Sequence, residues 1–99
     1  MKRMNPDLRA EHILIAAVAC ARRGAYDRVT RREVASEAGC SEALVSHHFT
    51  TMTQLRRSVM RRAVKDRDLK IVAQGVCARD PIALKAPDDL RQRALASLA

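Results

Sequence analysis

The sequence predicts an all-α fold, and three observations lead to this prediction. Apolar residues recur at three- and four-residue steps in several segments, which places them on one face of a helix. Residues typical of helix starts stand directly before these segments. Apolar residues make up 47% of the 99 positions, yet there is one Tyr, one Phe and no Trp, so alanine and aliphatic side chains must fill the core. Such a composition favours closely packed helices over a sheet.

The first predicted helix runs from Pro6 to about Arg23. Asn5 can accept hydrogen bonds from the free amides at its start, and a proline at the first helical position loses no hydrogen bond. Gly24 is expected to end the helix in a left-handed conformation. The inward face is formed by residues at helical spacing: Ala10, Ile13, Leu14, Ala17, Cys20 and Ala21.

Two short helices separated by a tight turn are predicted next. Thr30 and Glu33 have the spacing of a capping box, in which each side chain bonds back to the other residue, and the helix that they start ends at Gly39. Ser41 caps the following helix, which runs through Phe49. Two helices of about eight residues around a turn of about three form a helix-turn-helix motif.

A longer fourth helix and a short C-terminal helix complete the predicted fold. Thr51 and Gln54 again have capping-box spacing, so the fourth helix begins there and is expected to reach about Val72, with Gly75 as its stop. Asp88 is the expected cap of the last helix, which has one apolar side: Leu90, Ala94, Leu95 and Leu98.

The chain carries a formal net charge of +8, and most of its cations are arginines. The planar guanidinium suits phosphate oxygens and guanine edges, so a polyanion is the natural partner. A solvated basic surface with no ligand is the alternative, because net charge constrains association and not fold. A solvated face is expected for a run of arginines on the fourth helix: Arg56, Arg57, Arg61 and Arg62.

Cysteine usage and hydropathy predict a cytoplasmic protein. Cys20, Cys40 and Cys77 are odd in number and lack the spacing of a Cys-x-x-Cys pair or a zinc finger, which indicates reduced thiols. Polar residues interrupt the basic start of the chain before any apolar run, so no signal peptide is expected. The longest apolar stretch, from Ile13 to Ala21, is too short to span a bilayer.

Five segments occur in an order and at a spacing that resemble the DNA-binding domain of TetR-family transcriptional regulators: Ile13–Ala17, Gly24–Asp27, Thr30–Ala35, Ala38–Ser41 and Leu44–Phe49. The resemblance extends to Thr51 and Leu55, where the family has a capping residue and a buried leucine. It implies a TetR-like three-helix helix-turn-helix domain with a longer fourth helix, and a function in binding double-stranded DNA.

The third helix is the predicted recognition helix, because one of its faces must lock onto the domain while the other enters the major groove. Val45 and Phe49 are apolar and four residues apart, so they form the buried side. Ala43 can pack against a thymine methyl, and Glu42 can accept from a cytosine amino group. A solvent-facing charge favoured by the helix dipole is the alternative for Glu42. The side toward the groove carries Glu42, Ala43, Ser46 and His47.

Contacts to the DNA backbone are predicted around this helix. Arg31 and Arg32 stand in the first turn of the second helix, which crosses the sugar-phosphate backbone, although Arg32 can instead serve only to solvate the helix. The resemblance implies that His47 and His48 contact phosphate and sugar. Lys2 and Arg3 form a basic arm that either adds contacts or is a disordered tail. The candidate DNA-binding residues are Thr30, Arg31, Arg32, Ser41, Glu42, Ala43, Ser46, His47, His48 and Thr51.

We expect neither an enzyme nor a cofactor. The sequence contains no glycine-rich phosphate loop and no Cys-His or Ser-His arrangement with an orienting third group. Side chains of adjacent helical residues point about 100° apart and no third ligand is evident, so His47 and His48 are not expected to bind a metal.

A homodimer on a palindromic operator is expected, because a single helix-turn-helix contacts only a few base pairs. We divide the chain into a DNA-binding domain, residues 1–64, and a short helical segment, residues 65–99, that is expected to dimerise. Apolar residues that can supply the contact are Val64, Leu69, Ile71, Val72, Leu90, Leu95 and Leu98. The alternative is that the last helix folds back onto its own domain.

The predicted function is a repressor that occludes a promoter. Regulators of this family usually carry a large inducer-binding domain, for which the residues after the fourth helix leave no room, so no small-molecule inducer is expected. Two other functions stay open, because folds do not determine functions. One is a helical module that docks on polymerase or another regulator, and the other is a nonspecific DNA binder.

Overall fold

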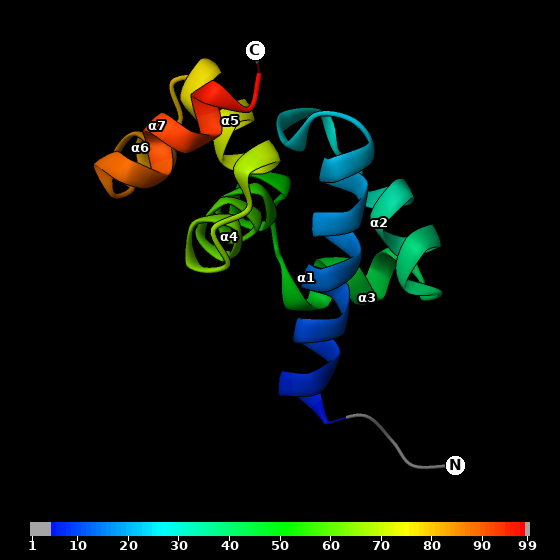
Figure 1. Ribbon diagram of the computed structural model, residues 1–99. Helices are drawn as coiled ribbons and strands as arrows, with labels where there is room; N and C mark the ends of the chain where they lie inside the picture. The colour runs from blue at the N-terminus through cyan, green and yellow to red at the C-terminus, as the bar shows by residue number, and fades with distance from the viewer. Residues whose placement is uncertain (1–4, 99) are drawn as a thin grey trace.

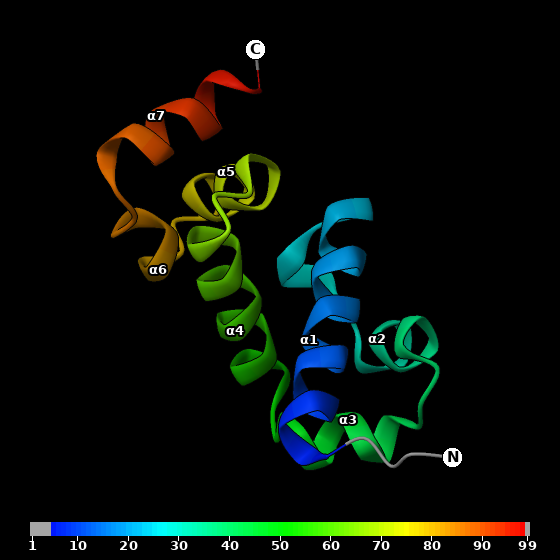
Figure 2. The ribbon, with the colours of Figure 1, turned by 60° about the horizontal axis from the view of Figure 1, so that its bottom comes forward.

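The computed structural model describes residues 5–98, and the fold is all-helical as predicted (Figure 1). α1 and α4 pack side by side, α2 lies along another side of α1, α3 lies at the end of α1 where α4 begins, and α5, α6 and α7 gather toward the other end (Figure 2). The elements of these residues are α1 (Pro6–Arg23), the 3-10 helix η1 (Tyr26–Arg28), α2 (Arg31–Ala38), α3 (Glu42–His48), α4 (Met52–Lys65), α5 (Leu69–Cys77), α6 (Pro81–Leu84) and α7 (Asp88–Ala96).

The start of α1 follows its predicted signals, whereas its end does not. The Asn5 side chain accepts a hydrogen bond of 2.8 Å from the Leu8 amide, and Pro6 is the first helical residue. Gly24 has a φ of −136°, so the left-handed conformation predicted there is wrong. The Gly24 amide instead continues the helical pattern by donating to the Cys20 carbonyl at 3.2 Å.

The turn between α2 and α3 has the predicted construction. Gly39 is left-handed with a φ of 68°, and the Cys40 amide donates to the Ala35 carbonyl at 3.0 Å. This hydrogen bond closes the last turn of α2 and reverses the chain. Ser41 then caps α3, which ends at His48 with Phe49 as its C-cap.

The fourth helix is shorter than predicted. It ends at Lys65 because Arg67 is left-handed, with a φ of 55°, and Asp68 caps a new helix by accepting from the Ile71 amide at 3.2 Å. Gly75 is therefore not a stop but lies inside α5. A Cβ at Gly75 would come within 2.5 Å of the Met60 side chain, so the glycine permits α4 and α5 to pack closely.

A left-handed arginine followed by a capping aspartate also ends α5, and the sequence did not predict this turn. Arg79 is left-handed with a φ of 58°, and the Asp80 side chain caps the short α6 by accepting from the Ile82 amide at 2.8 Å. The last helix begins one residue earlier than predicted. Its N-cap position is occupied by Pro87, and Asp88 is its first residue rather than its cap.

The C-terminal helices fold back onto their own chain, which was the alternative to a free apolar face. Ile71, Val72 and Leu90 are 0% exposed and belong to a core that continues through α1 and α4. The prediction that these residues form a dimer surface is therefore wrong, because a small chain needs its large aliphatic side chains inside. Leu95 and Leu98 remain exposed.

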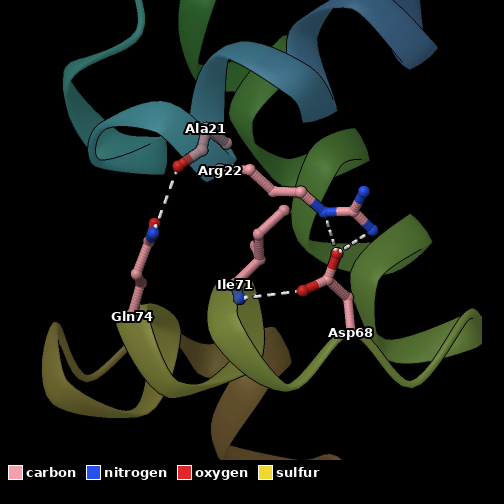
Figure 3. A network of polar contacts seen from close by, with 5 residues as sticks. All are labelled: Ala21, Arg22, Asp68, Ile71 and Gln74. Carbon is pink, nitrogen blue, oxygen red and sulfur yellow. Dashed lines mark hydrogen bonds and ion pairs between the residues drawn. The ribbon is translucent and has the colours of Figure 1, made fainter. Parts of the chain in front are cut away.

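Polar contacts join the C-terminal helices to the end of α1 (Figure 3). Asp68 accepts from the Arg22 guanidinium at 2.7 Å, and the Gln74 amide donates to the Ala21 carbonyl at 3.1 Å. The hydroxyl of Tyr26 donates to Asp80 at 2.9 Å. Burial of the ring, together with this hydrogen bond, raises the pKa of the Tyr26 phenol well above its ordinary value.

Candidate nucleic-acid interface

α3 presents a polar face outward while apolar side chains hold its other face to the domain. Val45 is fully buried and Phe49 is 9% exposed, as the four-residue spacing predicted. The outward side carries the predicted base-reading residues, which are exposed except for the half-buried Ser46: Glu42, Ala43, Ser46 and His47. A helix held in this way can insert its outward side into a major groove without unfolding the domain.

Ser41 positions the start of α3. Its hydroxyl oxygen accepts from the Leu44 amide at 3.1 Å, which satisfies one of the free donors of the first turn. The side chain is exposed, and a hydroxyl that accepts a hydrogen bond still has its own proton to donate. Ser41 can therefore cap the helix and donate to a phosphate oxygen at the same time.

The two histidines close the last turn of α3. The ring centroids of His47 and His48 are 5.0 Å apart, and the ring planes stand at 84° to each other. His47 is exposed and His48 is half-buried. The edge of one ring therefore meets the face of the other, and each imidazole can donate one N–H in its neutral form.

The first turn of α2 brings a cap and two arginines together. The Thr30 hydroxyl accepts from the Glu33 amide at 3.2 Å and donates to the Glu33 carboxylate at 3.1 Å. The carboxylate thus returns to the hydroxyl, not to the backbone amide that a complete capping box uses. Arg32 is exposed, whereas Arg31 is half-buried and its Nε has no partner among the described residues.

Thr51 starts α4 beside the end of α3. Its hydroxyl accepts from the Gln54 amide at 3.1 Å, as predicted. The Gln54 side chain accepts from the Thr50 amide at 3.0 Å, one residue earlier than in a capping box. Thr51 is exposed, and a hydroxyl that accepts a hydrogen bond still has its own proton to donate.

Two arginines of α4 hold this surface in place rather than forming the predicted solvated face. The guanidinium of Arg56 donates to the Val29 carbonyl at 3.1 Å, just before α2 begins. Arg62 pairs with Glu11 at 2.6 Å and is half-buried. This hydrogen-bonded pair lowers the pKa of the Glu11 carboxyl. The prediction fails for Arg56 and Arg62 because α1 and η1 offer them acceptors that local spacing does not reveal.

Two further contacts fix α2 against α1. The ring of His12 shares a 2.9 Å hydrogen bond with the Ala38 carbonyl, in which the imidazole must be the donor. Arg23 pairs with Glu37 at 2.6 Å, and this pairing raises the pKa of Arg23. The sequence alone does not reveal the contact of His12, because 26 residues separate it from Ala38.

The structure thus brings most of the candidate residues together around α3 and its two neighbouring helix starts. Lys2 and Arg3, the predicted basic arm, lie outside the described residues. Within residues 5–98, no group of three or more His, Cys, Asp or Glu side chains is placed to hold a metal ion. Across the same residues, no helix combines the length and the apolar character needed to cross a membrane.

An outward polar helix that follows a short glycine turn and an arginine-bearing helix defines a helix-turn-helix domain of the DNA-binding class. Residues 13–59 match the model of the bacterial regulatory proteins of the tetR family. The protein is therefore a DNA-binding regulator of transcription whose partner is double-stranded DNA. Comparison with curated proteins and with solved structures gives no significant match.

Proposed function

We propose that the protein is a sequence-specific repressor that binds a palindromic operator as a homodimer. The observation that carries this proposal is the orientation of α3, with Val45 buried and Ala43 and His47 exposed. A side chain can read a base edge only from such an outward position.

The proposed roles follow from the chemistry of each side chain. Ala43 packs against a thymine methyl, and Glu42 accepts from a cytosine amino group. Ser46 bonds to a base edge, since a hydroxyl serves either as donor or as acceptor. The remaining candidates contact phosphate or sugar: Thr30, Arg31, Arg32, Ser41, His47, His48 and Thr51.

Two copies would place two recognition helices on one face of the duplex, ~34 to 36 Å apart. We assign DNA binding to residues 1–64 and dimerisation to residues 65–99. Exposed leucines on α5, on α7 and just after α7 support this assignment, because apolar side chains left in water favour association: Leu69, Leu95 and Leu98.

Repression would follow from occupancy of a promoter in the cytoplasm, with no catalytic step. We further propose that protein abundance, not a small-molecule inducer, sets this occupancy. A surface hollow beside α1 and α2 is bordered by charged groups, Arg23, Arg28 and Glu33 among them, whereas ligand pockets are mostly apolar. A calorimetric screen that finds a compound releasing the protein from DNA would overturn this part of the proposal.

The main experiment selects DNA fragments from a random pool with the purified protein and sequences them. A palindromic consensus, bound orders of magnitude more tightly than random DNA, is the expected result. Affinity for the consensus should also fall steeply and log-linearly with salt, since phosphate contacts release counterions.

Two outcomes would contradict the proposal. A steep salt dependence without any consensus would identify a nonspecific DNA binder. The absence of binding to any duplex at low salt would favour a protein-binding module. Sedimentation with and without the consensus duplex tests the dimer, and a monomer in both conditions would remove it.

A further inference from the structure

A row of cations on α4 takes no part in the proposed DNA contacts. Arg57, Arg61 and Lys65 follow one another at four-residue spacing, and all three are exposed. We name this row the cationic stripe. None of the three forms an ion pair with a residue between 5 and 98. Like charges at this spacing slightly destabilise a helix, so the fold gains nothing from the stripe.

Two hollows, each with an apolar part, flank the cationic stripe. Leu14 and Ser58 line the hollow on the side of α1 together with Arg62, and Pro81, Ile82 and Asp80 line the one on the side of α6. Arg61 borders both. A ligand that lies along α4 would therefore meet positive charge on the crest of the helix and apolar surface on either side.

Two carboxylates beside the stripe, those of Glu11 and Asp80, are already engaged, whereas Asp66, next to Lys65, is exposed and forms no ion pair within residues 5–98. Both oxygens of Glu11 are held by Arg62, at 2.6 and 2.7 Å. This pairing is the main cause of the lowered pKa of Glu11, and the charge of Lys65 adds to it. Asp80 accepts from the Tyr26 hydroxyl and caps α6. The stripe thus has unused capacity for carboxylates from another molecule.

Distance from α3 separates the stripe from the predicted DNA surface. α3 lies at the end where α4 begins, and α4 runs away from it toward α5 (Figure 2). From residue 57 to residue 65 the helix rises by about 12 Å, at about 1.5 Å per residue. A duplex seated on α3 would therefore lie nearer to the start of α4 than to Lys65 at its end.

We propose that the stripe and its two hollows bind an acidic amphipathic helix of a partner protein. Carboxylates at four-residue spacing on that helix would face Arg57, Arg61 and Lys65, and its apolar side chains would enter the hollow beside Leu14. Recognition of an amphipathic helix by an apolar groove with complementary charge is a common mode of protein binding. The surface leaves α3 free, so the partner can bind to the regulator on DNA.

The test uses the full chain and two synthetic peptides. The probe is a helical peptide with Glu at every fourth position and Leu on the adjoining face, and the control peptide has the same composition in scrambled order. Each is titrated into isotope-labelled protein, and amide shifts are followed by nuclear magnetic resonance. The probe should shift amides around Leu14, Ser58 and Ile82, whereas the scrambled peptide should bind at least several-fold more weakly.

Matched variants test the charges. The double variant Arg61→Glu/Lys65→Glu should lower affinity for the probe about tenfold, because two attractions become repulsions. The variant Lys70→Glu/Lys85→Glu makes the same change of net charge at exposed positions outside the stripe and should keep the affinity. Thermal melts of both variants establish that each is folded, and both should keep the DNA sequence preference of the parent.

Several results would overturn this inference and leave the proposed repressor function unaffected. Equal binding of the scrambled peptide would show that the peptide's charge alone causes binding. Amide shifts confined to other surfaces would show that the probe does not bind at the stripe. Competition between the probe and a duplex for the stripe would assign the surface to DNA. A change in sedimentation caused by Arg61→Glu/Lys65→Glu would assign it to contacts between copies of this chain.

Discussion

The turn between α2 and α3 and the two turns that flank α5 follow one backbone path with different residues. In each, an amide donates to the carbonyl five residues earlier, and the residue before the donor is left-handed. The pairs are Cys40 to Ala35 at 3.0 Å, Asp68 to Ala63 at 2.8 Å and Asp80 to Gly75 at 2.8 Å. The left-handed residues are Gly39, Arg67 and Arg79.

The glycine turn and the two arginine turns differ in the strain of the left-handed residue and in the contacts that offset this strain. A left-handed glycine is free of strain, whereas a left-handed arginine costs roughly 1 to 2 kcal/mol. Each arginine turn is followed by an aspartate that caps the next helix and also contacts the first half of the chain, Asp68 with Arg22 and Asp80 with Tyr26. Substitutions around α5 should therefore change stability, and substitutions on the outward side of α2 and α3 should change DNA binding.

The largest effect is expected where the C-terminal helices enter the core. Leu90→Ala should lower the free energy of unfolding by about 2 to 5 kcal/mol, because a fully buried leucine leaves a cavity. Denaturant unfolding measures the loss. Leu98→Ala, at an exposed position of the same end, is the control and should change stability by less than about 0.5 kcal/mol in the monomer. Equal effects would mean that α7 is not packed as described.

Asp68 is expected to be the next most sensitive position. Asp68→Ala removes the cap of α5 and the partner of Arg22, and should cost about 2 kcal/mol in thermal or chemical unfolding. Asp68→Asn keeps a capping oxygen, so it should recover part of this loss. If the two variants are equally stable, the cap contributes nothing and the loss comes from the ion pair with Arg22.

On the DNA-binding side, Arg31→Ala should weaken binding to every duplex alike, by about 1 kcal/mol, and leave stability nearly unchanged. Exchange of Ala43 or Ser46 should instead alter the preferred sequence, because we propose that these side chains contact base edges. Binding measured on a panel of single-base operator variants separates the two effects. A preference that survives changes at Ala43, Ser46 and Glu42 would mean that α3 is docked differently.

Substitutions of the left-handed residues themselves should change the stability by smaller amounts and in opposite directions. Gly39→Ala should destabilise the protein by about 1 kcal/mol, since alanine is strained at a φ of 68°. Arg79→Gly relieves the same strain at a φ of 58° and should stabilise by about 0.5 kcal/mol, after the greater flexibility of glycine in the unfolded chain is subtracted. Paired unfolding curves compare them, and destabilisation by Arg79→Gly would contradict the comparison of the turns.

The smallest effect at neutral pH concerns the single tyrosine. A raised folded-state pKa means that Tyr26 contributes stability below the ordinary phenol value of about 10, and that this contribution is lost as the pH rises toward the raised value. Ultraviolet absorbance reports this residue alone, because the chain has one Tyr and no Trp. Ionisation should begin only above the ordinary range, and Asp80→Asn should bring it down. A normal titration in the folded protein would exclude the buried hydrogen bond.

The first three helices could be predicted because their signals are local. Asn5 with Pro6, Thr30 and Ser41 each stand at a helix start, and Gly39 marks the turn by its freedom to be left-handed. The outward side of α3 followed from two apolar residues in a short helix. These parts depend on neighbours within four or five positions, which a single sequence contains.

The remainder depended on contacts between distant residues. Apolar spacing continues through Ile71 and Val72, so nothing in the periodicity marks the end of α4, and a left-handed Arg67 has no compositional signal. Gly75 resembles a helix stop, yet its role is to admit Met60 across the helix interface. The partners of Arg56 and Arg62 belong to other elements, which is why a run of arginines did not reveal which of them are structural.

Arg22 and Arg23 are adjacent, yet they bind opposite neighbours. Arg22 holds Asp68 at the start of α5, and Arg23 holds Glu37 near the end of α2. The last turn of α1 is therefore tied to the start of α5 on one side and to α2 on the other, so two adjacent residues join the C-terminal helices to the helix that precedes α3.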